Sequence, residues 1–197
     1  DLDFIVPQKV NLILIPKCET PRQVHAVNRK IQEIRDKQDI RHQIWLIPSI
    51  ESALGVQRAF QIASSADNIV ALAIGLEDYT ADIGTTRTPE GFESFYARSR
   101  IVNAARAAGN QPIDSVFSDI NDMDGLIQNV KKSKALGFEG MGCIHPRQIK
   151  IIYESFAPNE AEIEKAKKIA RALNKAKDEG LGFVALGSKI IDPSLVK

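Results

Sequence analysis

The sequence predicts an α/β fold in which helices cover a parallel β-sheet. Five short apolar runs, rich in β-branched residues and leucine, alternate along the chain with segments whose apolar residues recur at helical spacing. The run 44–50 is apolar at almost every position, as a strand covered on both faces is. Strands and helices that alternate in this way build a parallel sheet with the helices outside.

The first two strand–helix units cover residues 10 to 63. The run 10–16 is the first strand, and the helix after it begins at Thr20-Pro21, because threonine is a good N-cap and proline suits the first helical position. The run 44–50 is the second strand, and Ser52 is the expected N-cap of the next helix. The residues expected to face inward from these helices are Val24, Val27, Ile31 and Ile34, and then Val56, Ala59, Ile62 and Ala63.

Three more units continue the series as far as Pro146. The third unit has a long loop through Arg87 and Pro89 between its strand and its helix. Gly109 and Gly137 each follow a helix, in the position where glycine commonly ends one. The expected elements are, in order, strand 69–75, helix 94–108, strand 112–118, helix 122–135, strand 138–145 and a short helix from Pro146.

The pattern changes after residue 157, and we divide the chain there. Pro158-Asn159 begins a long helix with one apolar stripe, and residues 181–191 are extended and punctuated by glycine. Residues 1–157 therefore form the region that contains the sheet, and residues 158–197 form a C-terminal helix and tail. The apolar stripe consists of Ile163, Ala166, Ile169, Ala170, Leu173 and Ala176.

Two architectures fit residues 1–157, namely an open doubly wound sheet and part of a closed (β/α)₈ barrel. No GxGxxG or Walker loop follows any strand, which argues against an open sheet that binds nucleotides. Five units are three short of a barrel, which takes about 250 residues. The chain also begins at Asp1 without an initiator methionine, so we expect that N-terminal strands of this domain are missing from the sequence.

Composition and charge exclude several classes of protein. Lys plus Arg number 26 and Asp plus Glu number 25, so the net charge of +1 gives no electrostatic reason to expect nucleic acid or a membrane surface as a partner. The apolar runs are far shorter than the roughly 20 residues of a membrane-spanning helix, and no signal peptide is visible. The two cysteines, Cys18 and Cys143, form no CxxC pair, which favours a reducing cytoplasm.

Two carboxylates at neighbouring strand ends are the strongest candidates for chemistry. Functional residues of parallel folds follow the carboxyl ends of the strands, where Glu51 and Asp78 stand. Neighbouring strands lie about 4.8 Å apart, so both carboxylates can reach one ion, and Mg²⁺ is usually held by one or two carboxylates and water. The alternative is a structural acidic rim that caps helix N-termini and pairs with Lys17 or Arg87.

Other polar residues near the strand ends have simpler interpretations from the residues alone. Lys17 could form a Schiff base, but an ion pair with Glu19 or Glu51 is the preferred interpretation. His145 is interpreted as a hydrogen-bonded core histidine and Cys143 as core packing. The basic residues that could hold phosphates, although solvated surface charge is the default interpretation, are Arg87, Arg98 and Arg147.

Several motifs, in order along the whole chain, resemble the citrate lyase β-subunit-like family, within the superfamily of HpcH/HpaI aldolases and malyl-CoA lyases. The resemblance is specific for the superfamily, and it includes both candidate carboxylates. The motifs are Leu14-Ile-Pro-Lys-Cys-Glu19, Pro48-Ser-Ile-Glu-Ser52, Gly75-Leu-Glu-Asp-Tyr-Thr-Ala-Asp-Ile-Gly84, Asn103-Ala-Ala-Arg-Ala-Ala-Gly109, Ile113-Asp-Ser-Val-Phe-Ser-Asp119, Ile144-His-Pro-Arg-Gln-Ile149 and Leu186-Gly-Ser-Lys-Ile-Ile-Asp-Pro193.

The resemblance implies a (β/α)₈ TIM barrel, of which this chain supplies about the last five units and a C-terminal helical extension. It implies a Mg²⁺-dependent carbon–carbon lyase, with Mn²⁺ as the alternative ion, that cleaves a citryl-, malyl- or citramalyl-type 3-hydroxyacyl thioester into a keto acid and an acetyl thioester. The thioester carrier is coenzyme A or an acyl-carrier protein. Family members are typically homotrimers or hexamers in the cytoplasm, and other citrate lyase subunits are possible partners.

The resemblance also assigns roles to residues. Glu51 and Asp78 match the metal ligands, and Asp192 matches an aspartate of a C-terminal segment that covers a neighbouring subunit's active site, where it would deliver a proton to the thioester enolate. We assign substrate binding to Lys17, Glu19, Arg87 and His145. The family's first three strands, which carry an acidic segment and a substrate-binding arginine, have no counterpart here.

Two rival interpretations stay open at this point. One is a class II pyruvate-type aldolase of the same superfamily, which acts on free hydroxy-keto acids rather than thioesters. The other is an inactive structural homologue, whose acidic rim would bind no metal. A rate that depends on the thioester separates the lyase from the aldolase, and metal titration separates both from the inactive homologue.

Overall fold

The computed structural model describes residues 1–178, 184–186 and 189–191. The chain divides into two compact units, Asp1–Phe156 and Ala157–Lys197, and each is described by itself. In the second unit, helix α9 (Glu160–Asp178) is followed by strands β6 (Val184–Leu186) and β7 (Lys189–Ile191), which pair antiparallel. Within the described residues, no helix combines the length and the hydropathy that crossing a bilayer requires.

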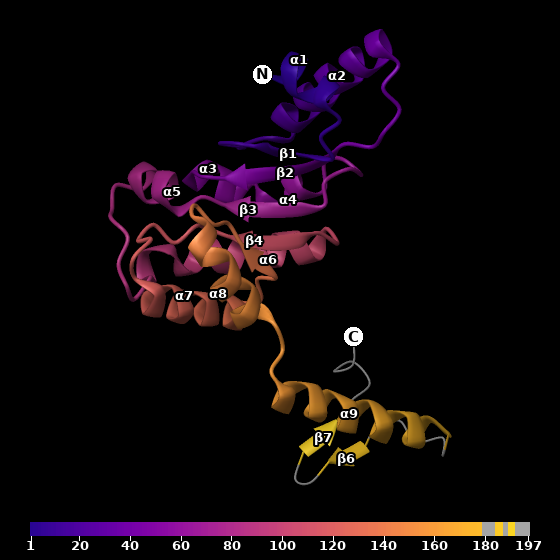
Figure 1. The fold of residues 1–197 in the computed structure, drawn as a ribbon, viewed down its shortest axis with the longest axis vertical. Helices are drawn as coiled ribbons and strands as arrows, with labels where there is room; N and C mark the ends of the chain where they lie inside the picture. The colour runs from indigo at the N-terminus through magenta and orange to yellow at the C-terminus, as the bar shows by residue number, and fades with distance from the viewer. Residues whose placement is uncertain (179–183, 187–188, 192–197) are drawn as a thin grey trace. The chain divides into compact units, whose positions relative to one another are not determined.

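The first unit contains a five-stranded parallel sheet, which confirms the predicted α/β class (Figure 1). The strands lie in the order in which they occur along the chain, so these five show no reversal of order of the kind that defines a doubly wound sheet. The strands are β1 (Leu12–Ile15), β2 (Trp45–Ile50), β3 (Ala71–Ile74), β4 (Gln111–Asp114) and β5 (Gly140–Met141).

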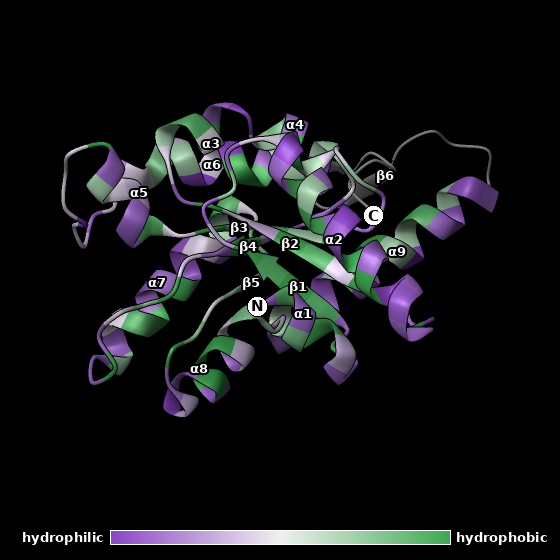
Figure 2. Cartoon of the chain, turned by 90° about the horizontal axis from the view of Figure 1, so that it is seen from above, coloured by the Kyte–Doolittle hydropathy of each residue, from purple (hydrophilic) through white to green (hydrophobic). Residues whose placement is uncertain are grey.

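The helices of this unit follow the strands along the chain, and Figure 2 shows α2, α4, α6, α7 and α8 in an arc around the sheet. Right-handed crossovers between strands that never reverse their order place successive helices on the same face. The helical elements are α1 (Leu2–Ile5), the 3₁₀ helix η1 (Val6–Gln8), α2 (Pro21–Gln38), α3 (Ala53–Gln57), α4 (Ala59–Ala63), α5 (Leu76–Asp82), α6 (Phe92–Ala107), α7 (Met123–Leu136) and α8 (Pro146–Phe156).

The two faces of the sheet differ in what covers them. Leu46 and Leu72 belong to the core under the helices and are fully buried. On the opposite face, Leu12 and Trp45 are register partners, and their exposed fractions are 45% and 40%. The expectation that the second strand is covered on both faces is therefore wrong at Trp45, whereas the end of the strand at Ser49 and Ile50 is buried.

Helix ends follow the predicted signals. Ser52 accepts a hydrogen bond from the backbone N–H of Gly55 at 3.1 Å and so caps α3 as expected. At the start of α2, Gln23 Oε1 accepts from the backbone N–H of Thr20 at 3.0 Å. Gly137 ends α7 at a φ of 101°, a conformation that glycine adopts without strain.

Some element boundaries differ from the prediction. The helix expected after Ser52 is two short helices that meet at Arg58, and α5 lies within the stretch expected to be a loop. The strand expected over 138–145 ends at Met141, so the chain has left the sheet before Cys143. Cys143 is consequently exposed, and its interpretation as core packing is wrong.

Candidate metal and substrate site

Glu51 and Gly75 stand side by side at the carboxyl ends of β2 and β3. Their preceding residues, Ile50 and Ile74, are register partners, and the N–H of Gly75 donates to the carbonyl of Ile50 at 2.9 Å. A Cβ atom built on Gly75 would lie 2.7 Å from Cγ of Glu51, which is closer than carbon atoms pack. The glycine therefore allows the Glu51 side chain to lie across the end of β3.

Asp78 lies in the first turn of α5, the helix that begins directly after β3. Its Oδ1 atom forms an ion pair with Nζ of Lys17 at 3.1 Å, and both side chains are exposed. The hydrogen bond and charge of Asp78, with a smaller contribution from the charge of Glu51, raise the pKa of Lys17 above its ordinary value. The ion pair predicted with Glu19 or Glu51 is thus made with Asp78 instead, and Lys17 reaches it from a backbone φ of 48°.

Glu51 and Asp78 line one cavity of about 270 Å³ at the carboxyl ends of the strands. Among the described residues, none donates a hydrogen bond to the Glu51 carboxylate. The ion pair of Lys17 is made with Oδ1 of Asp78 and does not use the second carboxylate oxygen. The other lining residues are Leu14, Ser49, Ala73, Ile74, Gly75, Leu76, Glu77, Ile113, Asp114, Ser115, Val116 and Gly142.

The donor set of this cavity fits Mg²⁺. Mg²⁺ prefers carboxylate oxygen and keeps several waters, so two carboxylates suffice when substrate oxygens and water complete the octahedron. Within the described part of the chain, no cluster of three or more His, Cys, Asp or Glu residues forms a metal cage, and the fit therefore depends on Glu51 and Asp78 alone. An unpartnered carboxylate beside a cavity is the arrangement that a hard cation would satisfy.

The other acidic residues at this edge have structural partners. Asp82 accepts from the N–H of Ala53 at 2.8 Å, and Glu19 accepts from the hydroxyl of Ser52 at 2.6 Å. Glu77 pairs with Arg87 at 2.8 Å. The structural interpretation of the acidic rim therefore holds for these three residues, and the ion pair of Asp78 with Lys17 agrees with it as well. Glu51 is a rim carboxylate that this interpretation does not explain.

The remaining predicted residues lie in different places. Arg87 also donates to the carbonyl of Val116 at 3.1 Å and lines a second cavity of about 410 Å³. His145 is partly exposed just before α8, where its Nδ1 accepts from the N–H of Arg147, so the interpretation as a core histidine is wrong. Asp192 lies outside the described residues.

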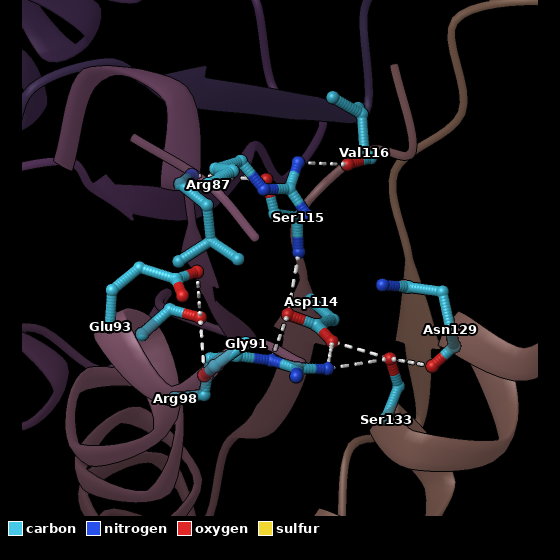
Figure 3. A network of polar contacts seen from close by, with 11 residues as sticks. Arg87, Gly91, Glu93, Arg98, Asp114, Ser115, Val116, Asn129 and Ser133 are labelled. Carbon is cyan, nitrogen blue, oxygen red and sulfur yellow. Dashed lines mark hydrogen bonds and ion pairs between the residues drawn. The ribbon is translucent and has the colours of Figure 1, made fainter. Parts of the chain in front are cut away.

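A buried polar network between β4 and helices α6 and α7 was not predicted from the sequence (Figure 3). Asp114, at the end of β4, forms an ion pair with Arg98 of α6, and the two side chains are only 1% and 7% exposed. Ser133 of α7 donates to the same carboxylate. The interpretation of Arg98 as a solvated charge is therefore wrong. Ile101, Val102 and Ala105 of α6 are buried, and the helical spacing of Arg98 to them indicates that it faces the core.

Substituting Gly75 by alanine is expected to move Glu51 out of the cavity, because the added Cβ would overlap Cγ of Glu51. We expect Mn²⁺, used as a probe of the candidate metal site, to bind about ten-fold more weakly, which is ~1.4 kcal/mol. Titration followed by electron paramagnetic resonance measures this. Gly140→Ala is the matched control, because its Cβ would lie 3.5 Å from Cδ1 of Ile113 in ordinary contact. Equal affinities in the two variants would contradict the prediction.

Comparison with known proteins shows the family to which the chain belongs. A model of the family described as HpcH/HpaI aldolase/citrate lyase matches residues 1–146. The chain belongs to this family. It is 36% identical over 198 residues to citrate lyase subunit beta of Escherichia coli (strain K12), an alignment that covers all of this chain and 65% of that protein. The chain thus spans about two thirds of the length of this relative.

Further similarities extend across the family. The chain is 29% identical to L-malyl-CoA/beta-methylmalyl-CoA lyase of Rhodobacter capsulatus, over 96% of this chain and 65% of that one. The crystal structure of protein CitE from Mycobacterium tuberculosis in complex with magnesium, acetoacetate and coenzyme A superposes with a TM-score of 0.72 at 28% identity. It matches 94% of this chain and 64% of that chain.

Proposed function

We propose that this protein is a carbon–carbon lyase that uses Mg²⁺, with Mn²⁺ as the alternative ion, to cleave a 3-hydroxyacyl thioester. The products would be a keto acid and an acetyl thioester, and the substrate would be of citryl, malyl or citramalyl type. The observation that carries the proposal is that Glu51 and Asp78 line one cavity at the carboxyl ends of the strands. Family membership supports the same chemistry, since relatives are named as citrate and malyl-CoA lyases.

In the proposed mechanism, Glu51 and Asp78 would hold the metal, and Lys17 would supply a positive charge beside the substrate carboxylate. When bound, Mg²⁺ would act as a Lewis acid toward the substrate's hydroxyl and carboxylate oxygens. A general base would take the hydroxyl proton, the O–H electron pair would form the carbonyl of the keto acid as the carbon–carbon bond breaks, and the electron pair of that bond would pass to the thioester as an enolate. Asp192 is our proposed donor of the proton that converts the enolate carbon into the methyl group of the acetyl thioester.

We also propose that the five strands of the first unit form an arc of a (β/α)₈ barrel. The unreversed strand order and the open apolar face of β1 and β2 support this proposal, because the interior of such a barrel is lined by apolar side chains. The cavity with Glu51 and Asp78 would then lie in the barrel mouth.

Residues 158–197 would cover a neighbouring subunit's active site in a homotrimer or hexamer in the cytoplasm. The thioester carrier would be coenzyme A or an acyl-carrier protein, and other citrate lyase subunits would be further partners.

The proposal is tested by offering the purified protein citryl-, malyl- and citramalyl-CoA with and without Mg²⁺. We expect a keto acid to be released from at least one thioester, and release to stop when a chelator removes the metal. Free hydroxy-keto acids are the control. Cleavage of the free acids at the same rate would support the aldolase instead, and absence of both cleavage and metal binding would support an inactive homologue.

A further inference from the structure

The buried carboxylate of Asp114 is held from three sides. Nε of Arg98 donates to its Oδ1 at 3.2 Å, and a second guanidinium nitrogen and the Ser133 hydroxyl both donate to Oδ2. The guanidinium also lies over the ring of Phe138, 5.7 Å from its centroid. Because helices α6 and α7 both contribute partners, the end of β4 is fixed against two helices (Figure 3).

This network extends by two hydrogen bonds to the metal site. The backbone N–H of Ser115 donates to Oδ1 of Asp114 at 2.8 Å, which fixes the residue directly after β4. The hydroxyl oxygen of Ser115 then accepts from the backbone N–H of Leu76 at 3.0 Å. Leu76 is the first residue of α5, and Asp78 is the third.

The bond to Leu76 replaces a helix cap that α5 cannot supply itself. The first N–H groups of a helix have no partner within the helix and are usually satisfied by the side chain of the N-cap residue. The N-cap of α5 is Gly75, which has no side chain, and the close approach of Glu51 requires that it has none. Ser115 therefore caps α5 from the position directly after the neighbouring strand β4.

We infer that Ser115 is a positioning residue for the metal ligand Asp78, and that the network of Arg98, Asp114 and Ser133 holds Ser115 in place for this role. The inference rests on the proposed function, because it gives Asp78 the role of metal ligand. Its structural basis is that the bond of Ser115 sets where the first turn of α5 begins. The direction of the Asp78 side chain follows from that turn.

The test measures Mn²⁺ affinity and the exchange rate of the Leu76 amide in the purified protein. Ser115→Ala removes the acceptor of Leu76, so we expect Mn²⁺ to bind about ten-fold more weakly and the Leu76 amide to exchange about ten-fold faster. Ser115→Thr keeps a hydroxyl and should restore both values toward wild type. Val24→Ala, which removes fully buried methyl groups from α2, is the control for lost stability and should leave the Mn²⁺ affinity unchanged.

The possible outcomes separate this inference from the proposed function. If wild type binds Mn²⁺ and Ser115→Ala binds it equally well, the positioning role is wrong and the metal site stands. If the wild-type protein binds no Mn²⁺, both proposals are overturned. If Val24→Ala weakens binding as much as Ser115→Ala, the effect reflects stability alone and the positioning role is wrong. Should Ser115→Ala not fold, Ser115→Cys, whose thiol is a weaker acceptor, replaces it with the same expectation.

Discussion

Replacing Glu51 by glutamine is expected to abolish Mg²⁺ binding and the cleavage reaction while leaving the fold intact. Glutamine has the same shape but lacks the charge that a hard cation requires. Lewis-acid stabilisation of several kcal/mol corresponds to roughly a thousand-fold in rate, and this is the loss that we expect in kcat/KM. Because no described residue donates a hydrogen bond to the Glu51 carboxylate, the free energy of unfolding should change by less than about 0.5 kcal/mol.

Asp82→Asn is the matched control for Glu51→Gln. Asp82 is another carboxylate at the same edge of the sheet, but it accepts from the N–H of Ala53 and does not line the cavity. We expect this variant to keep its affinity for Mn²⁺ in a titration, with a loss of stability on the order of 1 kcal/mol from the weakened cap. Equal loss of Mn²⁺ affinity in both variants would show that the carboxylates at this edge attract the metal only through their total charge, and would contradict the role of Glu51 as a ligand.

Replacing Arg98 by alanine is expected to cost about 3–5 kcal/mol of unfolding free energy, because it leaves the carboxylate of Asp114 buried without its counter-charge. The loss should appear as a lower midpoint in urea denaturation. A loss of this size is a large share of the roughly 5–15 kcal/mol that stabilises a typical protein. If the variant did not fold, its absence from the soluble fraction would be the same result in its extreme form.

Arg106→Ala is the comparison for Arg98→Ala. Arg106 pairs with Glu139, but the two side chains are 50% and 37% exposed, so water can solvate either partner when the other is removed. Exposed ion pairs contribute about 0–1 kcal/mol, and we expect a loss in this range. Similar losses at Arg98 and Arg106 would mean that the burial of the first pair has no energetic consequence.

Most of the sheet and the helices could be predicted because their signals are local. Thr20 and Ser52 mark helix starts, and Gly137 marks a helix end, by chemistry that acts within a few residues. The end of β5 before Cys143 could not be predicted from its apolar run. A strand ends where its pairing partner ends, and Met141 pairs with Asp114, the last residue of β4. Helix α5 was missed for a similar reason, because its cap comes from Ser115, a residue far away in the sequence.

The candidate site shows the same division. The meeting of Glu51 and Asp78 at one cavity follows from the geometry of parallel strands and could be predicted from their positions after consecutive strands. The sequence left the partner of Lys17 open among Glu19, Glu51 and the acidic rim, because it does not show the direction of a side chain that follows a strand at a backbone φ of 48°. The pair of Arg98 and Asp114 joins a helix and the strand after it, a contact that no single stretch of sequence reveals.

The missing side chain at Gly75 makes three consecutive strand ends energetically dependent on one another. The Glu51 side chain, after β2, lies against Gly75. The Ser115 hydroxyl, after β4, accepts from the first N–H of α5, which Gly75 has no side chain to cap. Contributions of residues that share a neighbour in this way do not add. A double-mutant cycle between positions 75 and 115 would therefore return a coupling energy, and neither single substitution can be assigned its own share of metal affinity.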